Sequence, residues 1–301
     1  MQGIWKQFLA LLVLISVAIW LAVIYYPEPK LHLIACDVGQ GDAILAVYGK
    51  TQILVDGGPN NRVLDCLSNN LPFWDREIEL VILTHPQTDH YTGLIEVFRR
   101  YTINKLLANP IDSGAQAYQV LKDVVGGSGT EVVYPTSGMV IRLGLMYLDI
   151  LHPSDALISS KSIAKSDSLS AKVLGTRTTA EDPNDFSIVA ILTLGKFDAL
   201  LTGDIGPAIS DLVAEKLAVR LPLTIEYIKV PHHGSKNGLS SYLLNASDPE
   251  IAVISAGKNN RYGHPHQEVL EMLSGYELRV LRTDEMGDVE VITDGKSWLI
   301  E

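Results

Sequence analysis

The stretch Leu83-Thr84-His85-Pro86-Gln87-Thr88-Asp89-His90 places two imidazoles and a carboxylate within six residues. The apolar run from Leu80 to Leu83 that leads into it is typical of a buried β-strand. His85 then follows the end of that strand, and Asp89 and His90 lie on the tight loop beyond it. Because zinc and manganese accept imidazole nitrogen and carboxylate oxygen as ligands, this stretch predicts a metal site at a strand end.

Side chains of the metal-ligating type recur further along the chain. Six of the eight histidines fall in three short clusters, and two aspartates end apolar runs: His85 with His90, His232 with His233, His264 with His266, Asp56 and Asp204. This recurrence at strand ends indicates one shared metal centre. Single motifs also have structural alternatives, since Asp89 or Asp204 could cap a helix and His232-His233 could form a polar turn.

Length and composition indicate a globular protein. The chain has 301 residues, 47% of them hydrophobic, which is enough for a sizeable core in one large domain or two ordinary ones. Its net charge of -11 repels polyanions, so a contact with nucleic acid requires a local basic patch or bound metal. Cys36 and Cys66 are too few for a zinc knuckle or a disulfide framework, and they are most simply small buried residues, although an oxidising compartment could pair them.

The N-terminal segment predicts a membrane anchor. Residues 8–26 carry no charge, and a helix of that length spans about 28 Å, enough for the hydrocarbon core of a bilayer. Lys6 favours a cytoplasmic N-terminus, which places the rest of the chain outside the cytoplasm. We therefore expect an anchor over residues 1–30 and one domain over residues 31–301. The alternative is a cleaved signal peptide, although the apolar run is long for one.

Apolar runs between Gly-rich and polar turns predict the order of the remaining elements. Strands are expected near residues 31–35, 43–47, 51–55, 80–83, 105–108, 131–134, 140–143, 146–151, 186–194, 197–201, 227–230, 251–255, 278–281 and 289–292. Helices are expected at 62–70, 93–100, 118–125, 209–220 and 267–273. Residues 154–185 lack a clear period and predict a mobile loop or lid. Strands that alternate with helices are typical of an α/β (α+β) fold.

Several motifs occur in the order found in one known family. They are Asp37-Val38-Gly39-Gln40-Gly41-Asp42-Ala43, Asp56-Gly57-Gly58, His85 to His90, Asn184-Asp185-x-Ser187, Gly203-Asp204, Lys229 to Ser235, and Gly263-His264-Pro265. Together they resemble the metallo-β-lactamase domain of the ComEC family of DNA-uptake (competence) proteins, over residues 31–294. The resemblance implies a four-layer αββα sandwich with a metal site at one edge of its paired sheets. It also implies a hydrolytic phosphodiesterase that acts on DNA.

The resemblance also implies a role for each matching residue. The metal ligands would be His85, Asp89, His90, Asp204 and one of the pair His232 and His233. They would hold one or two zinc or manganese ions, with Asp89 and Asp204 as the catalytic carboxylates. Residues expected to support the ligands are Asp37, Asp56 and Gln87. Residues expected to face the substrate are Asn184, Ser235, Lys236 and His264, and Lys229 could also neutralise phosphate charge.

Gln87 departs from the superfamily pattern H-x-H-x-D-H, because it stands where the second histidine would be. An amide oxygen binds zinc more weakly than imidazole does, so one metal position should lose affinity or favour manganese or magnesium. The main hypothesis is a membrane-tethered, extracytoplasmic metallohydrolase that acts on DNA, with a separate channel protein as a possible partner. The alternative is a non-catalytic surface protein that binds nucleic acid or cell-wall phosphate.

Overall fold

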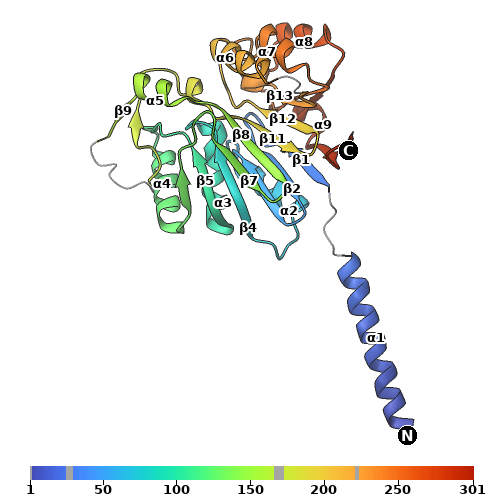
Figure 1. Ribbon diagram of the computed structural model, residues 1–301. Helices are drawn as coiled ribbons and strands as arrows, with labels where there is room; N and C mark the ends of the chain where they lie inside the picture. The colour runs from blue at the N-terminus through green and yellow to red at the C-terminus, as the bar shows by residue number, and fades with distance from the viewer. Residues whose placement is uncertain (1, 25–29, 166–172, 221–223) are drawn as a thin grey trace.

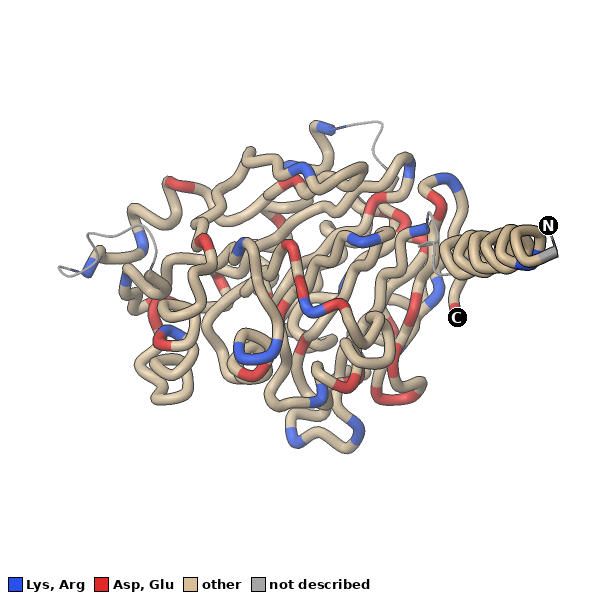
Figure 2. The backbone as a smooth tube through the Cα atoms, turned by 90° about the horizontal axis from the view of Figure 1, so that it is seen from below, with Lys and Arg blue, Asp and Glu red and all other residues tan. Residues whose placement is uncertain are grey.

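The computed structural model describes residues 2–24, 30–165, 173–220 and 224–301. Two β-sheets pack against each other, and helices cover the outer face of each sheet (Figure 1). This arrangement is the four-layer αββα sandwich, so the predicted fold class is confirmed. Acidic and basic positions are mixed over the body, as the view from below shows (Figure 2).

The first sheet has the strand order β17-β16-β1-β2-β3-β4-β5-β6. Its strands are β1 (Leu31–Ala35), β2 (Ile44–Tyr48), β3 (Thr51–Val55), β4 (Glu77–Leu83), β5 (Thr102–Ala108), β6 (Glu131–Val133), β16 (Val289–Thr293) and β17 (Trp298–Ile300). Strands β3 to β6 are parallel, and β1 runs in the same direction because β2 is antiparallel to both β1 and β3. The carboxyl ends of these strands therefore meet at one edge.

The second sheet has the order β15-β14-β13-β12-β11-β8-β7. Its strands are β7 (Val140–Leu143), β8 (Met146–His152), β11 (Val189–Leu194), β12 (Phe197–Leu201), β13 (Tyr227–Lys229), β14 (Ile251–Ile254) and β15 (Arg279–Arg282). Strands β12 to β15 are parallel. A hydrogen bond of 2.7 Å from the Lys196 amide to the Gly295 carbonyl joins the β11–β12 and β16–β17 hairpins, so the amino ends of β12 and β1 share an edge.

Helices pack on the outer face of each sheet. Those on the first sheet are α2 (Arg62–Asn70), α3 (Thr88–Arg100) and α4 (Gln116–Ser128), and those on the second are α6 (Pro207–Ala218), α7 (Ser241–Ser247) and α8 (Gln267–Ser274). Short elements complete the fold: η2 (Pro231–Gly234) and α9 (Thr283–Met286). Sequence reasoning missed α7, β17 and α9, because each is too short to show a period.

Alternate residues of the central strands face two different cores. In β4, Leu80 and Ile82 join the cluster between the sheets, whereas Val81 and Leu83 pack against the helices. Because both faces of β4 are buried from Leu80 to Leu83, this part of its sequence is continuously apolar instead of alternating. This explains why the run before His85 was recognisable as a buried strand.

The expectation of a loop over residues 154–185 was wrong for its described part. The structure forms α5 (Asp155–Lys161), β9 (Ile163–Ala164), β10 (Arg177–Thr178) and η1 (Pro183–Phe186) there. Ser154 caps α5, because its hydroxyl accepts a hydrogen bond of 3.2 Å from the Leu157 amide. These elements are too short for hydrophobic periodicity to reveal them.

Helix α1 (Gln2–Ile24) extends away from the body (Figure 1). Its segment Gly3–Val23 has a mean hydropathy of 2.2, is 0% buried, and is long and apolar enough to cross a membrane by length and composition only. Tyr25 and Tyr26, the end of the predicted span, lie outside the described residues, as does the predicted boundary segment 27–29. The division into an anchor and a domain stays a prediction.

Candidate metal centre

Four side chains meet where the strands of both sheets end. Asp89 and His90 lie in the first turn of α3, after β4, and Asp204 follows β12. His233 lies in η2, directly after β13. Each offers one ligand atom, and these atoms lie within 4.8 Å of one another. The tertiary structure thus brings together residues from two sheets that are far apart in sequence.

A left-handed turn directs the late histidine pair. His232 and His233 have φ angles of 52° and 55°, a left-handed conformation that residues other than glycine adopt only at a cost. His233 is buried and reaches the centre, whereas His232 is partly exposed and is not in the four-residue group found among the described residues. The sequence could not decide between the two, because they are adjacent and chemically identical.

The geometry fits a metal ion. Oδ2 of Asp204 lies 3.2 Å from Nε2 of His90 and 3.1 Å from Nε2 of His233. Both Nε2 atoms are buried and make no hydrogen bond within the described chain. The opposite ring nitrogens do have partners: Nδ1 of His90 lies 2.8 Å from Oδ2 of Asp56, and Nδ1 of His233 lies 3.0 Å from the Ser255 carbonyl oxygen. Metal-ligating histidines are commonly held in this way, with one nitrogen anchored and the other directed inward.

Asp56 holds the loop that carries the early ligands. Its carboxylate accepts hydrogen bonds from the amide and hydroxyl of Thr84, at 2.8 and 2.7 Å, in addition to the contact with His90. Asp56 is fully buried and has a φ of 59°, a conformation that Asp adopts more readily than most residues. It therefore fixes both the end of β4 and the ring of His90.

Sequence reasoning missed a buried ionic network beside the centre. The Lys229 ammonium is 1% exposed and donates to the Asp42 carboxylate, to Oδ1 of Asp204 at 3.1 Å and to the Gly203 carbonyl at 2.8 Å. Asp42 also lies 3.3 Å from Nδ1 of His233. The expectation that Lys229 contacts phosphate was wrong, because two carboxylates enclose it. The only signals in the sequence were its place at a strand end and the place of Asp42 at the end of a Gly-rich turn.

Opposite charges face one another in the buried centre and shift its pKa values. Burial opposes the charged forms, but the carboxylates of Asp204 and Asp56 raise the pKa of His90 well above its usual value. Burial likewise opposes the ionised form of Asp204, yet His233 and Lys229 hold its pKa well below the usual range. Burial and the neighbouring His90 lower the pKa of His85 to about 3. A metal ion held by His90 would have to displace the proton on Nε2, so its binding would strengthen as the pH rises.

Two further predicted ligands and Gln87 lie beside this group. His85 is fully buried, its Nε2 atom lacks a hydrogen bond within the described chain, and its ring lies 4.1 Å from that of His90. Nδ1 of His232 is also buried without a described partner. Gln87 directly precedes α3, and its carbonyl accepts the His90 amide at 3.0 Å. The described residues thus form one four-ligand group, with His85 next to it.

Asp37 does not support the ligands in the way expected. Its carboxylate pairs with Arg62 at 2.5 Å, and its amide donates to Asp288. Asp37 is partly exposed, at the start of the turn that Asp42 ends. Asp42, at the other end of the turn, contacts Lys229 and His233 instead, and spacing alone does not reveal which carboxylate a turn directs inward.

The residues expected to face the substrate occupy different environments. The His264 ring stacks against that of His233 at 6.3 Å between centroids, and Lys236 is exposed after η2. Asn184 is buried in η1, and its Oδ1 atom lacks a described hydrogen bond. Ser235 runs against the expectation, because it is 3% exposed and its hydroxyl accepts a backbone hydrogen bond within its own turn.

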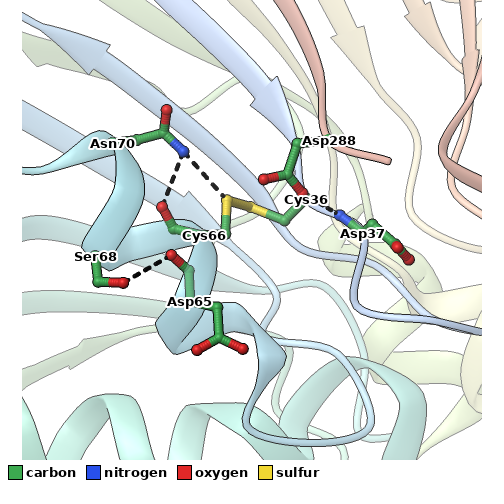
Figure 3. The surroundings of a disulfide bond; sticks show 7 residues. All are labelled: Cys36, Asp37, Asp65, Cys66, Ser68, Asn70 and Asp288. Carbon is green, nitrogen blue, oxygen red and sulfur yellow. Dashed lines mark hydrogen bonds between the residues drawn. A yellow bond between two sulfur atoms is a disulfide. The ribbon is translucent and has the colours of Figure 1, made fainter. Parts of the chain in front are cut away.

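The two cysteines form a disulfide bond. Cys36 follows β1 and Cys66 lies in α2, with Cα atoms 5.8 Å apart (Figure 3). The side-chain amide of Asn70 donates to the Cys66 carbonyl at 2.9 Å. Of the two possibilities that the sequence left open, the structure has the paired one. The bond ties the turn that carries Asp42 to a helix of the outer layer.

Comparison with known proteins identifies a superfamily and a group of relatives. The profile of the Metallo-beta-lactamase superfamily matches residues 36–258. ComE operon protein 3 of Bacillus subtilis is 27% identical over 280 residues, covering 84% of this chain and 32% of that protein. Recombination protein 2 of Haemophilus influenzae is 28% identical over 268 residues, covering 88% of this chain and 29% of that protein. The chain therefore spans about a third of the length of these relatives.

A third relative and a solved structure agree with these matches. Competence protein ComA of Neisseria gonorrhoeae is 32% identical over 109 residues, covering 36% of this chain and 16% of that protein. The crystal structure of the metallo-beta-lactamase fold protein YhfI from Bacillus subtilis has a TM-score of 0.53 at 12% identity, and the match covers 85% of this chain and 96% of that one. The sequence matches confirm the resemblance to ComEC-family competence proteins, and the structural match supports the fold.

Proposed function

Since this chain belongs to the metallo-β-lactamase superfamily, we propose that it is a divalent-metal-dependent phosphodiesterase that cleaves DNA. The observation that carries the proposal is the meeting of Asp89, His90, Asp204 and His233 where the strands of both sheets end, with the Nε2 atoms of both imidazoles facing the Asp204 carboxylate. The competence relatives favour DNA over other phosphodiesters.

We assign one zinc or manganese ion to these four residues. A second metal position, of lower affinity, lies next to His85 and Gln87. A bound ion supplies an activated water and neutralises charge on the phosphate. Asp204 is held in place by Lys229, while Asp89, with a side chain 27% exposed, is the carboxylate placed to accept a proton at the solvent side. The ammonium of Lys236 is exposed and can pair with a phosphate oxygen.

We further propose that α1 anchors the domain on the outer side of the membrane. Lys6 before the apolar segment favours a cytoplasmic N-terminus, and the Cys36–Cys66 disulfide is typical of an oxidising, extracytoplasmic compartment. Because the relatives are competence proteins, we also propose a membrane channel protein as the partner.

The test uses the full chain in detergent with linear DNA and manganese. Asp204→Asn should reduce cleavage about 100-fold or more, because it removes the charge that faces both imidazoles. Asp37→Asn, at a carboxylate that pairs with Arg62 outside the group, is the matched control and should cleave normally. If Asp204→Asn cleaves as fast as the parent chain, the hydrolase proposal is wrong. DNA that is bound but never cleaved by the parent chain would instead support the binding protein suggested by Gln87.

A further inference from the structure

Two neighbouring aromatic side chains lie at the α2–β4 turn and are more than half exposed. Phe73 is 79% exposed and Trp74 is 58% exposed, with ring centroids 4.8 Å apart. The turn is closed by a hydrogen bond of 2.9 Å from the Asp75 amide to the Pro72 carbonyl. Its Asp75 carboxylate accepts a further hydrogen bond of 2.9 Å from the buried Gln52 side chain in β3. The rings are therefore presented by a turn that is fixed to the sheet.

This turn lies at the end of the sheet where the chain enters from α1. Leu31 at the start of β1 pairs with Tyr48, Tyr48 pairs with Thr51, and β3 is parallel to β4, so the amino ends of β1, β3 and β4 share one edge. Three strand spacings separate β1 from β4, or about 14 Å. Trp74 lines the same pocket as His32 of β1. In Figure 1 the α2–β4 connection lies at the lower end of the body, on the side of α1.

The metal centre lies at the opposite edge. It is built at the carboxyl ends of β4, β12 and β13, and the seven residues of β4 span about 23 Å. Only seven Cα steps separate Ile24 from Leu31, so the end of α1 lies within about 25 Å of β1. One tether of this length keeps the domain near a bilayer but does not set its orientation.

We propose that Phe73 and Trp74 insert into the headgroup region of the bilayer that holds α1. This second contact fixes the domain with its metal edge directed away from the membrane, where a long polymer can reach it. The inference rests on the proposed membrane anchoring. Aromatic rings favour the membrane interface, where their apolar bodies leave water.

The charges around the turn indicate whether insertion of the two rings requires anionic lipid. The pocket beside the turn is lined by more acidic side chains than basic ones, with Asp75, Glu77, Glu79 and Glu290 facing Lys50, and Arg76 is exposed in the turn itself. Insertion should therefore depend on the rings and not on anionic lipid. Vesicles of phosphatidylcholine alone are the appropriate probe.

The experiment measures tryptophan fluorescence of the full chain in such vesicles, with and without lipid that carries a nitroxide near the headgroup. The reporter chain keeps only Trp74, through Trp5→Phe, Trp20→Phe and Trp298→Phe. We expect its emission maximum to lie at a shorter wavelength than that of an indole exposed to buffer. With the nitroxide lipid, its emission should lose about half or more of its intensity.

Two control chains separate the possible failures. A chain that keeps only Trp20 reports whether α1 enters the bilayer. A chain without native tryptophans but with Tyr242→Trp reports from α7, at the top of the body in Figure 1, and should not be quenched; Tyr242 is 46% exposed. Quenching of Trp20 without quenching of Trp74 would overturn the inference and leave the anchor intact. Absence of quenching at Trp20 would overturn both, and equal quenching at position 242 would contradict a fixed orientation.

Discussion

At the scale of single residues, the centre depends on carboxylates that hold other side chains. Asp56 receives hydrogen bonds from the amide and hydroxyl of Thr84 and lies 2.8 Å from Nδ1 of His90. An asparagine in its place keeps the shape and tolerates the positive φ, but its Nδ2 group can only donate hydrogen bonds, so it keeps one acceptor oxygen where the carboxylate has two. At least one of the groups that now face the carboxylate, the amide and hydroxyl of Thr84 and Nδ1 of His90, therefore loses its acceptor.

Asp56→Asn should weaken binding of zinc or manganese to the full chain about 10- to 100-fold, because the ring of His90 is no longer held in one orientation. Isothermal titration calorimetry in detergent measures the affinity. Asp37→Asn, a partly exposed aspartate paired with Arg62, should leave the affinity unchanged. Equal affinities of Asp56→Asn and the parent chain would show that Asp56 does not position the ligand.

Lys229 compensates the buried charge of two aspartates. Its ammonium lies between Asp42 and Asp204. Burial lowers the pKa of Lys229, but these two carboxylates outweigh that effect and keep the pKa above its usual value. Removing the ammonium would leave the carboxylates buried with less compensation, and this is costly in a low-dielectric interior.

Lys229→Met should therefore lower the free energy of unfolding of the metal-free chain by about 3–5 kcal/mol, as measured by urea denaturation. Lys236→Met is the matched control, because Lys236 is exposed, and its effect should stay within about 0.5 kcal/mol. A similar small effect for both variants would mean that the network contributes little to stability. Added metal should partly restore the stability of Lys229→Met, since a cation then faces Asp204 again.

At the scale of secondary-structure elements, short connections place the ligands. The end of β1 is joined to α2 by the Cys36–Cys66 disulfide, which closes a segment with a sequence separation of 30. Between these cysteines the chain passes through Asp42, whose amide donates to the Asp89 carbonyl at 3.2 Å. The disulfide thus restrains a turn that contacts the ligand loop directly.

Replacing both cysteines, Cys36→Ser with Cys66→Ser, should lower the free energy of unfolding by about 3–4 kcal/mol, the loop-closure value for this separation. Thermal denaturation of the full chain with and without reducing agent measures the effect. The parent chain should lose stability on reduction, whereas the double variant should not respond. A parent chain that is insensitive to reduction would indicate that the bond does not stabilise the fold.

At the scale of the whole molecule, the two ends of the sandwich have different roles. The carboxyl ends of the parallel strands carry Asp89, His90, Asp204 and His233, while the amino ends carry the entry from α1 and the exposed pair at 73–74. This separation follows from strand direction, because loops at one edge of parallel strands cannot reach the other edge. The proposed membrane contact and the proposed cleavage of DNA can therefore occur at the same time.

The sequence alone predicted the sandwich and most of its ligand-type residues. The continuous apolar run before His85 predicted a buried strand, and the ordered motifs through His233 predicted the family. These signals are local, because strand burial and loop chemistry leave a pattern within a few residues. The same local character explains the failure at 154–185, where each element is shorter than a recognisable period.

Only the tertiary structure decided which side chains meet. It selected His233 instead of His232 for the four-residue group, and it placed Asp42, not Asp37, beside the ligands. It also showed that Lys229 is enclosed by carboxylates instead of facing solvent. Adjacent residues of the same type differ only in the direction that the backbone gives them. That direction depends on left-handed turns and on packing between segments more than 150 residues apart, such as Asp42 and Lys229, which no local pattern records.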